Sequence, residues 1–329
     1  MGLWDWFKKR QKAKDPFAEL YSRQPRAMDP MRPQSGDEPQ KPKRKGSKGG
    51  ATRTLADLAA MLEMEPAALK AFKPSYHTFN VPKRNGKMRR ICAPDAATKH
   101  LQRLLLRRVF ARLRAHPAAH GFEKGRSIVS NAAEHTDAAV VIKMDIKNYF
   151  EETLDSRVEE YFRAIGWDKA AVRVLMALTT HEQGLPQGAP TSPRLSNLVN
   201  YRLDMSLDAL AKKLGMTYTR YADDMTFSSS ADDRAKIASL LGHVENILLD
   251  FEYDVHWRKT LCLRRWHQRQ TVTGLVVNDG VGLPRETRRW LRAVEHRLRT
   301  GREASLTPTQ LQGWRAFEAM VDGWEGPVG

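Results

Sequence analysis

Apolar residues recur along this chain at two spacings, which separate the expected helices from the expected strands. The spacing of three and four residues that is typical of an amphipathic helix runs through residues 55–62, 66–72, 96–115, 194–203, 285–299 and 307–321. Thr54 precedes the first of these segments and is a residue type that favours a helix start.

Short runs of β-branched and aromatic residues predict the strands. Residues 76–82 and 88–92 flank Asn85-Gly86, a dipeptide that strongly indicates a hairpin turn. Residues 140–145 have the pattern of a buried strand that ends in an acid, and two further runs, 216–220 and 225–227, flank an acidic turn. Helices and strands are mixed, so we expect an α+β fold.

The N-terminal end differs in composition from the rest. Residues 15–50 are rich in Pro, Gly, Lys, Arg and Gln, with almost no apolar residue after Met31. Such a stretch cannot bury enough apolar surface to order itself. We therefore expect residues 1–50 to form a basic, flexible extension and order to begin near Thr54.

Charge indicates the kind of partner. The 329 residues are 41% hydrophobic, which suits two or three subdomains with a core, and the formal net charge is +17. Residues 1–50 hold 13 Lys and Arg against 6 Asp and Glu, so an excess of +10 remains on the rest. This excess predicts a polyanionic partner, because Lys and Arg that neutralise phosphates release counterions. A generally solubilising surface is the alternative.

Cysteine content and hydropathy favour a cytoplasmic protein. Cys92 and Cys262 are too few for a disulfide framework or a zinc site. No run of 18 apolar residues predicts a membrane-spanning helix. Residues 1–14 could form a short interfacial helix, but we favour a docking segment or basic arm.

Three carboxylates carry the candidate chemistry. Asp145 ends one predicted strand, and Asp223 and Asp224 lie in the turn Tyr-Ala-Asp-Asp at residues 221–224. An acidic pair alone is common in a solvated hairpin turn. With a third acid at a strand end, the set can hold two Mg²⁺ ions, which would stabilise the attacking and leaving oxygens of a phosphoryl transfer.

Two further segments fit such a site. Basic residues surround the hairpin turn at 83–90, where they could clamp a triphosphate or a template strand; a solvated hairpin tip is the alternative. Residues 184–193 are rich in Gly and Pro and predict a shaped loop. That loop could present Gln187 and backbone N–H groups to a nucleotide, or be an ordinary connection.

The order of these signals is distinctive. A basic hairpin, a strand-borne Asp145, a Leu-Pro-Gln-Gly loop, a Tyr-Ala-Asp-Asp turn and Lys259 follow one another, and together they resemble the reverse transcriptases over residues 75–280. The resemblance implies that Lys259 protonates the departing pyrophosphate. It implies that two Mg²⁺ ions are bound by Asp145, Ile146, Asp223 and Asp224.

The same resemblance implies contacts to the incoming nucleotide. Phe150 lies five residues after Asp145, where the family places a ring that excludes a 2′-OH and so selects deoxynucleotides. Gln187 matches the residue that packs against the nucleotide. Lys83 and Arg89 match the triphosphate contacts of the fingers.

Two short motifs narrow the resemblance to the retron reverse transcriptases. Asn131 and His135 fit an Asn-Ala-x-x-His element, and Val272, Thr273 and Gly274 fit a Val-Thr-Gly element beyond the palm. The resemblance implies that these residues contact RNA. Polar contacts along a helix face are the alternative for Asn131 and His135.

A basic stripe supports RNA binding from the residues themselves. In the predicted helix 285–299, apolar residues occupy one face. The basic face comprises Arg285, Arg289, Arg292, His296 and Arg299. A solvated surface helix is the alternative, but beside a polymerase palm we favour a thumb helix that follows nucleic-acid phosphates.

The retron resemblance also implies an activity and partners. Such an enzyme binds a structured noncoding RNA encoded nearby and primes from the 2′-OH of a guanosine in that RNA. It copies part of the RNA into DNA from dNTPs, which leaves branched RNA–DNA (msDNA). An effector protein encoded nearby and a role in antiphage defence are implied as well.

The implied fold is a right-hand polymerase. We expect the fingers at 51–138, the palm at 139–280 and a helical thumb at 281–329, with 170–200 contributing to the junction of fingers and palm. The palm should be a small antiparallel sheet of the split βαβ type.

Three other functions stay open. One is a reverse transcriptase of another lineage, either group II intron-like or diversity-generating. Another is an RNA-binding scaffold that no longer polymerises, which primer extension with Mg²⁺ and dNTPs would distinguish. The third is a basic protein that associates with membranes through residues 1–14.

Overall fold

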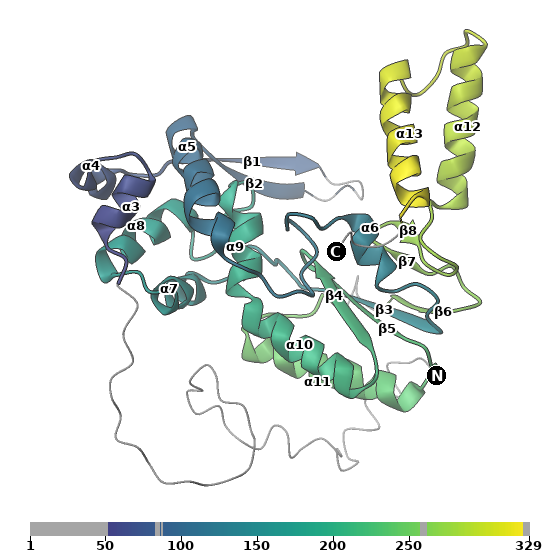
Figure 1. Ribbon diagram of the computed structural model, residues 1–329, viewed down its shortest axis with the longest axis horizontal. Helices are drawn as coiled ribbons and strands as arrows, with labels where there is room; N and C mark the ends of the chain where they lie inside the picture. Colours follow the sequence, from purple (N-terminus) through teal and green to yellow (C-terminus); the bar gives the residue numbers. More distant parts are fainter. Residues whose placement is uncertain (1–51, 83–85, 87, 257–261, 325–329) are drawn as a thin grey trace. The chain divides into compact units, whose positions relative to one another are not determined.

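The computed structural model describes residues 52–82, 86, 88–256 and 262–324. The chain divides into two units, Met1–Gly50 and Ala51–Gly329, and all described residues belong to the second. Lys83, Lys259 and the N-terminal extension lie outside the described residues. Helices surround small antiparallel sheets (Figure 1), which confirms the α+β class.

A four-stranded sheet lies at the centre of the described unit. Its strand order is β4-β5-β3-β6 and every neighbouring pair is antiparallel. The bounds are β3 Val140–Asp145, β4 Thr217–Tyr221, β5 Asp224–Ser229 and β6 Cys262–Arg265. The predicted strands at 140–145, 216–220 and 225–227 are thereby confirmed to within two residues.

One face of this sheet packs on two helices, α10 Tyr201–Lys213 and α11 Arg234–Asp250 (Figure 1). Alternate strand residues point to opposite faces, and Ile142, Met144 and Phe227, which share the helix-covered face, are at most 1% exposed. Asp145 and Asp224 belong to the opposite face. The apolar residues of these strands are buried, whereas Asp145 is partly exposed and Asp224 is exposed.

A first hydrophobic core joins the elements on the N-terminal side. It includes Leu58, Leu105, Phe162 and Leu175, which are all fully buried. The helices that form it are α3 Leu55–Met61, α4 Pro66–Ala71, α5 Ala96–Leu104, α7 Asp155–Ala164, α8 Lys169–Thr179 and α9 Thr191–Val199. Thr54 caps α3 through a capping box with Asp57, as the sequence predicts.

The predicted basic hairpin is present beside this core. Strands β1 Tyr76–Pro82 and β2 Met88–Pro94 pair in an antiparallel register with Tyr76 opposite Pro94. The residues of its turn are described only at Gly86, which has a positive φ of 77°. The hairpin itself therefore forms as predicted from its two flanking strands.

One predicted helix differs from the structure. Residues 96–115 do not form a single α-helix, because α5 is followed by a π-helical turn at Leu105–Val109 and a 3-10 turn at Phe110–Arg112. The apolar pairs 104–105 and 109–110 are five residues apart and all four side chains are buried. A π turn, with its i to i+5 spacing, puts such pairs on one face.

A second helix starts earlier than expected. α9 begins at Thr191, inside the segment predicted to be loop, and contains Pro193 in its first turn. Proline is tolerated there because the first N–H groups of a helix have no partner within the helix. The helical run at 194–203 is otherwise confirmed, with a break at Asn200 before α10.

A second hydrophobic core joins α6 Ile128–Ala133, the small hairpin β7 Thr271–Val272 and β8 Leu275–Val276, and two C-terminal helices. These are α12 Arg285–Arg299 and α13 Pro308–Asp322, which confirm the predicted helices at 285–299 and 307–321. Val129, Val272, Leu291 and Val321 meet in this core. None of the helices in the described ranges combines the length and apolarity needed to cross a membrane.

Candidate active site

The sheet register places two of the three predicted carboxylates opposite each other and the third in the adjoining turn. Asp145 at the end of β3 is directly opposite Asp224 at the start of β5. Residues opposite each other in an antiparallel pair share a face, with Cβ atoms about 5 Å apart. Asp223 lies in the two-residue turn between Tyr221 and Asp224, and its carbonyl accepts a hydrogen bond from Ile146 N at 2.9 Å. That bond fixes the turn against the end of β3.

The turn itself has an unusual backbone. Ala222 has a φ of +58°, a left-handed conformation that favours glycine. Such a conformation persists in a residue with a Cβ only when the surroundings hold it. Ala222 therefore indicates that contacts around the turn, rather than local preference, determine where Asp223 lies.

The donor set of these acids fits hard divalent cations. Carboxylate oxygens are the ligands that Mg²⁺ prefers, and Mg²⁺ usually takes one or two carboxylates together with substrate phosphates and water. Across the described ranges, no three His, Cys, Asp or Glu side chains are grouped closely enough to hold a metal by themselves.

One loop connects the predicted nucleotide contacts. Leu185 N donates to the carbonyl of Phe150 at 3.0 Å, and the carbonyl of Gln187 accepts from Cys92 N of β2 at 2.8 Å. Gly188 has a φ of +136° and lies so close to β2 that an added Cβ would be 2.9 Å from the carbonyl oxygen of Cys92. The Leu-Pro-Gln-Gly loop therefore bridges Phe150 and the basic hairpin.

Arg89 is exposed on the same hairpin. It is two residues before Ile91, so both side chains belong to one face of β2. The side chain of Ile91 contacts the loop at Gly188. Arg89 therefore shares the hairpin face that meets this loop, whereas its neighbour Arg90 pairs with Glu182.

A loop that the sequence analysis did not single out closes on the acidic turn. Residues 118–120 pair with β4, since Arg220 N donates to Ala118 O and His120 N donates to Arg220 O, both at 2.8 Å. The Phe122 ring centroid is 6.2 Å from that of Tyr221 and 6.3 Å from that of Phe150. The signal available in the sequence was a glycine pair, Gly121 and Gly125, directly before the helix start at Ser127.

The first retron-type motif is buried. His135 is 0% exposed, with Nδ1 2.7 Å from Ser228 Oγ of β5 and Nε2 2.7 Å from Thr219 Oγ1 of β4. Asn131 is 1% exposed, and its Oδ1 has no hydrogen-bond partner among the described residues. Direct RNA contact by these two side chains does not fit this structure, because both are covered. His135, which follows α6, instead attaches this segment to β4 and β5 of the central sheet through its two ring nitrogens.

The second motif forms the turn of the small hairpin. Thr273 and Gly274 have positive φ values of 47° and 87°, and Val272 is fully buried. Thr273 Oγ1 donates to the carbonyl of Ile128 at 2.9 Å, at the start of α6. The segments that carry the two motifs, far apart in the sequence, therefore lie side by side, and they share a hydrophobic core with α12.

The burial of His135 predicts a pH dependence of stability. Burial lowers the pKa of His135 to about 3 from an ordinary 6.5. Between these values the unfolded chain binds a proton that the folded chain excludes. The free energy of unfolding contributed by this residue is therefore complete above pH 6.5 and falls below it, by about 1.4 kcal/mol per pH unit.

We expect His135→Gln to flatten this slope, because an amide can serve both hydroxyls without titrating. Urea unfolding at several pH values between about 7 and 5 measures it. His100→Gln, at an exposed position of α5, is the matched control and should leave the slope unchanged. An unaltered slope in His135→Gln would contradict the assigned pKa.

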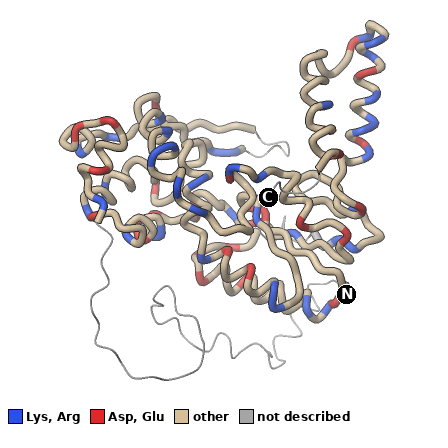
Figure 2. The backbone as a smooth tube through the Cα atoms, in the orientation of Figure 1, with Lys and Arg blue, Asp and Glu red and all other residues tan. Residues whose placement is uncertain are grey.

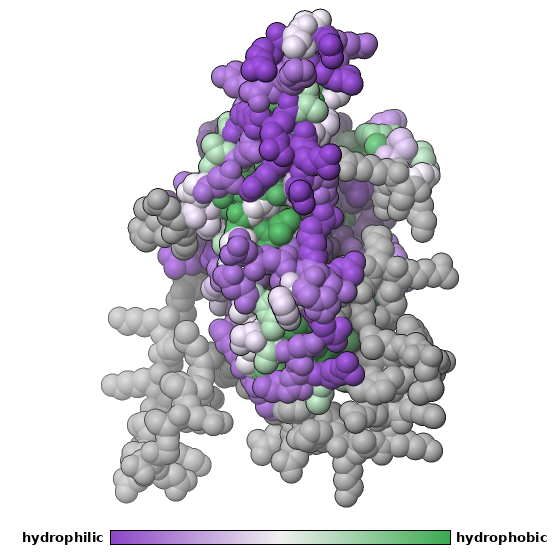
Figure 3. Space-filling model, turned by 90° about the vertical axis from the view of Figure 1, so that its right-hand side faces the viewer, coloured by the Kyte–Doolittle hydropathy of each residue, from purple (hydrophilic) through white to green (hydrophobic). Residues whose placement is uncertain are grey.

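The basic stripe of α12 is exposed as predicted. Figure 2 shows Lys and Arg along α12, and the upper part of Figure 3, where the helical pair lies, is mostly hydrophilic. Arg288 pairs with Asp322, but within the described ranges Arg285, Arg289, Arg292 and Arg299 form no ion pair. Their charges are available for an external anion.

A groove with a volume of about 550 Å³ lies at the base of this helix. Its lining includes Arg269, Arg285, Arg288, Arg292 and Arg315. Acids pair with three of these: Glu286 with Arg269, Asp322 with Arg288, and Glu295 and Glu318 with Arg315. Arg285 and Arg292 thus supply the unpaired positive charge of the groove.

Comparison with known proteins gives consistent matches. The family model for reverse transcriptase (RNA-dependent DNA polymerase) matches residues 81–280. The retron Mx162 reverse transcriptase of Myxococcus xanthus is 38% identical over 285 residues, or 76% of this chain, and this chain spans 59% of its length. The retron Mx65 reverse transcriptase of the same organism is 36% identical, with 82% of this chain and 69% of the relative covered. The retron Ec86 reverse transcriptase of Escherichia coli is 32% identical, with 75% and 77% covered.

Proposed function

This chain belongs to the retron reverse transcriptases, and from that premise we propose that it copies part of a structured noncoding RNA into DNA from dNTPs. It has the right-hand polymerase fold, with an antiparallel palm sheet that carries the acidic turn. The observation that carries the proposal is the register that puts Asp145 opposite Asp224 and ties Asp223 to Ile146.

In the proposed reaction, Asp145, Asp223 and Asp224, with the backbone of Ile146, would hold two Mg²⁺ ions. Divalent ions supply charge stabilisation for an in-line displacement at the α-phosphate. The acids orient the ions at the end of the palm sheet, and the attacking hydroxyl is the primer 3′-OH or the initiating 2′-OH of a guanosine.

The nucleotide contacts follow from the same geometry. Phe150 packs near Phe122, which in turn lies near Tyr221 of the acidic turn, and this position supports the proposal that the Phe150 ring excludes a 2′-OH. Gln187 and Arg89 lie on the loop and strand that flank it. Lys83 and Lys259 keep their proposed roles at the triphosphate and the pyrophosphate.

The RNA surface is the basic stripe of α12 with the groove at its base. A-form RNA presents phosphates and 2′-hydroxyls more readily than base edges, and unpaired arginines suit such contacts. Gly274, exposed in the hairpin turn near this groove, offers backbone groups to the same RNA. The product is branched msDNA, and we propose an effector protein as partner in antiphage defence.

The salt dependence of RNA binding tests this surface. Arg292→Gln should weaken binding to the cognate RNA and lower the slope of log K against log salt by about 1, because one phosphate contact is lost. Lys236→Gln is the matched control. Lys236 is exposed on α11, which covers the face of the palm sheet that does not carry the acids. If Arg292→Gln and Lys236→Gln have the same slope of log K against log salt, the RNA does not contact Arg292.

Isolation of small nucleic acids from cells tests the proposed product. We expect expression of the gene with its flanking region to yield a short DNA that stays attached to RNA until a debranching enzyme is added. Loss of that species in Asp223→Asn would assign it to this active site. Free DNA with no RNA attached would instead favour another reverse transcriptase lineage.

A further inference from the structure

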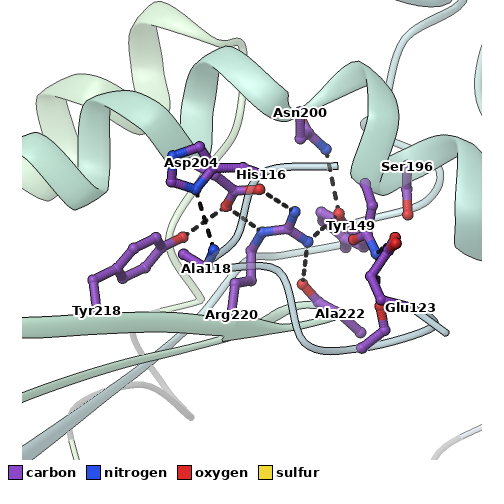
Figure 4. Close-up of polar contacts among 12 residues, drawn as sticks. His116, Ala118, Glu123, Tyr149, Ser196, Asn200, Asp204, Tyr218, Arg220 and Ala222 are labelled. Carbon is purple, nitrogen blue, oxygen red and sulfur yellow. Dashed lines mark hydrogen bonds and ion pairs between the residues drawn. The ribbon is translucent and has the colours of Figure 1, made fainter. Parts of the chain in front are cut away.

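A buried ion pair lies next to the catalytic turn (Figure 4). Arg220 of β4 and Asp204 of α10 are both 0% exposed. Nε and Nη2 of Arg220 donate to the two carboxylate oxygens of Asp204 at 2.7 and 2.6 Å. Burial works against the charged guanidinium, but the combined interactions with Asp204, Tyr149 and Tyr218 outweigh it, so the pKa of Arg220 lies well above its usual value. Arg220 therefore stays charged inside the palm.

Stability alone does not explain such a pair. Removing two charges from water costs free energy that their attraction only partly offsets, and apolar residues of similar volume often replace buried pairs without loss. A charged pair at this position therefore requires a reason in what the guanidinium touches besides Asp204.

The remaining nitrogen of Arg220 holds the catalytic turn. Nη1 donates to the carbonyl of Ala222 at 3.0 Å. Ala222 is the left-handed residue directly before Asp223. Because that conformation needs external support, the hydrogen bond from Arg220 maintains the backbone from which both acids of the turn project.

The same nitrogen also reaches the residue beside Phe150. Arg220 Nη1 donates to the hydroxyl of Tyr149, and the guanidinium carbon is 5.3 Å from the Tyr149 ring centroid. Asn200 Nδ2 supports that hydroxyl at 3.3 Å. The Tyr149 and Phe150 ring centroids are 5.4 Å apart. One guanidinium thus contacts both the metal-binding turn and the neighbour of the proposed sugar-checking ring.

We infer that Arg220, anchored by Asp204, is a positioning residue that fixes the catalytic turn relative to Phe150. Both the rate of nucleotide addition and the discrimination between deoxynucleotides and ribonucleotides then depend on a side chain that touches neither substrate nor metal. The inference rests on the proposed polymerase function for its kinetic readouts, and on the contacts of Arg220 alone for its structural one.

The test replaces the charged network by apolar residues of similar volume. Asp204→Leu, Tyr218→Phe and Arg220→Met are combined, because Tyr218 OH donates to Asp204 Oδ1 and would lose its acceptor. Tyr149→Phe alone removes the second contact and leaves the Ala222 contact in place. Arg220→Lys keeps the charge but lacks the fork that reaches Asp204 and Ala222 together.

Three measurements separate positioning from stability. Thermal unfolding reports folding, steady-state primer extension gives kcat and KM for dNTPs and rNTPs, and hydrogen exchange follows the segments 148–152 and 219–225 against α11 as reference. In the triple variant we expect a folded protein, faster exchange in both segments, and a kcat about 10- to 100-fold lower with a smaller change in KM. Tyr149→Phe should keep most of the rate and lose sugar discrimination.

Wild-type kcat, discrimination and exchange in the folded triple variant would overturn the inference. If the triple variant does not fold, Arg220→Lys decides: a reduced kcat with faster exchange at 219–225 supports positioning, and wild-type values for both reject it. If the wild-type protein extends no primer, but the triple variant still exchanges faster than the wild type in both segments, the proposed function is rejected and the positioning role of Arg220 stands.

Discussion

Asp223→Asn should abolish DNA synthesis while RNA binding persists. The substitution keeps the size of the side chain but removes one of the negative charges that the register gathers at the end of the palm sheet. Without it, the site loses charge complementarity to divalent ions at the place where phosphoryl charge develops, and we expect a loss of at least about 10³-fold in rate. Primer extension on a defined template measures it.

RNA binding should survive in this variant, since the basic stripe belongs to α12 and not to the strands and turn that carry the acids. A mobility-shift titration against the wild type checks this. Asp250→Asn is the matched control, because Asp250 is exposed at the end of α11 and should leave both properties unchanged. Full synthesis by Asp223→Asn would refute the metal site.

Gly121→Ala should lower kcat by about 10- to 100-fold with little change in fold. An added Cβ would be 2.9 Å from Ala222 N, closer than real Cβ contacts, so loop or turn must move. The loop cannot retreat freely, because residues 118 and 120 are hydrogen-bonded to Arg220 of β4. The catalytic turn is therefore expected to shift, and misplacement of about 1 Å can cost a factor of 10².

A second glycine provides the control for this prediction. Gly242 lies inside α11, and an added Cβ there meets nothing within 4 Å. Gly242→Ala should leave synthesis unchanged and raise the free energy of unfolding by about 0.5–1 kcal/mol, because alanine favours the helix. If Gly121→Ala keeps the wild-type kcat, the turn tolerates more displacement than its contacts suggest.

Local patterns were sufficient to predict the elements that carry the acids. Residues 140–145 are a short apolar run that ends in an acid, and strand-forming residues flank the turn at Asp223, so strands that end in acids could be expected. The helices at 285–299 and 307–321 follow from the spacing of their apolar residues. In these cases the local preference and the packed structure agree.

The other features of the site could not be predicted, because they depend on contacts between residues that are far apart in the sequence. Arg220 is buried in β4, and its burial depends on the carboxylate of Asp204, which approaches from α10. His135 was expected to reach RNA, but it is covered because two hydroxyls of the sheet face α6. The close approach that requires Gly121 likewise depends on the tertiary position of the turn.

The second core has a consequence for biosynthesis. It includes both Val129 of α6 and Val321 of α13, so this core is completed only when one of the last segments of the chain has been translated. At ribosomal speeds of about 5–20 residues per second, the interval between these two residues is roughly 10 to 40 seconds. During it, the apolar side of α6 lacks its final neighbours, and the nascent polypeptide is open to chaperones or to aggregation. Translation speed and chaperone supply should therefore influence the yield of this protein.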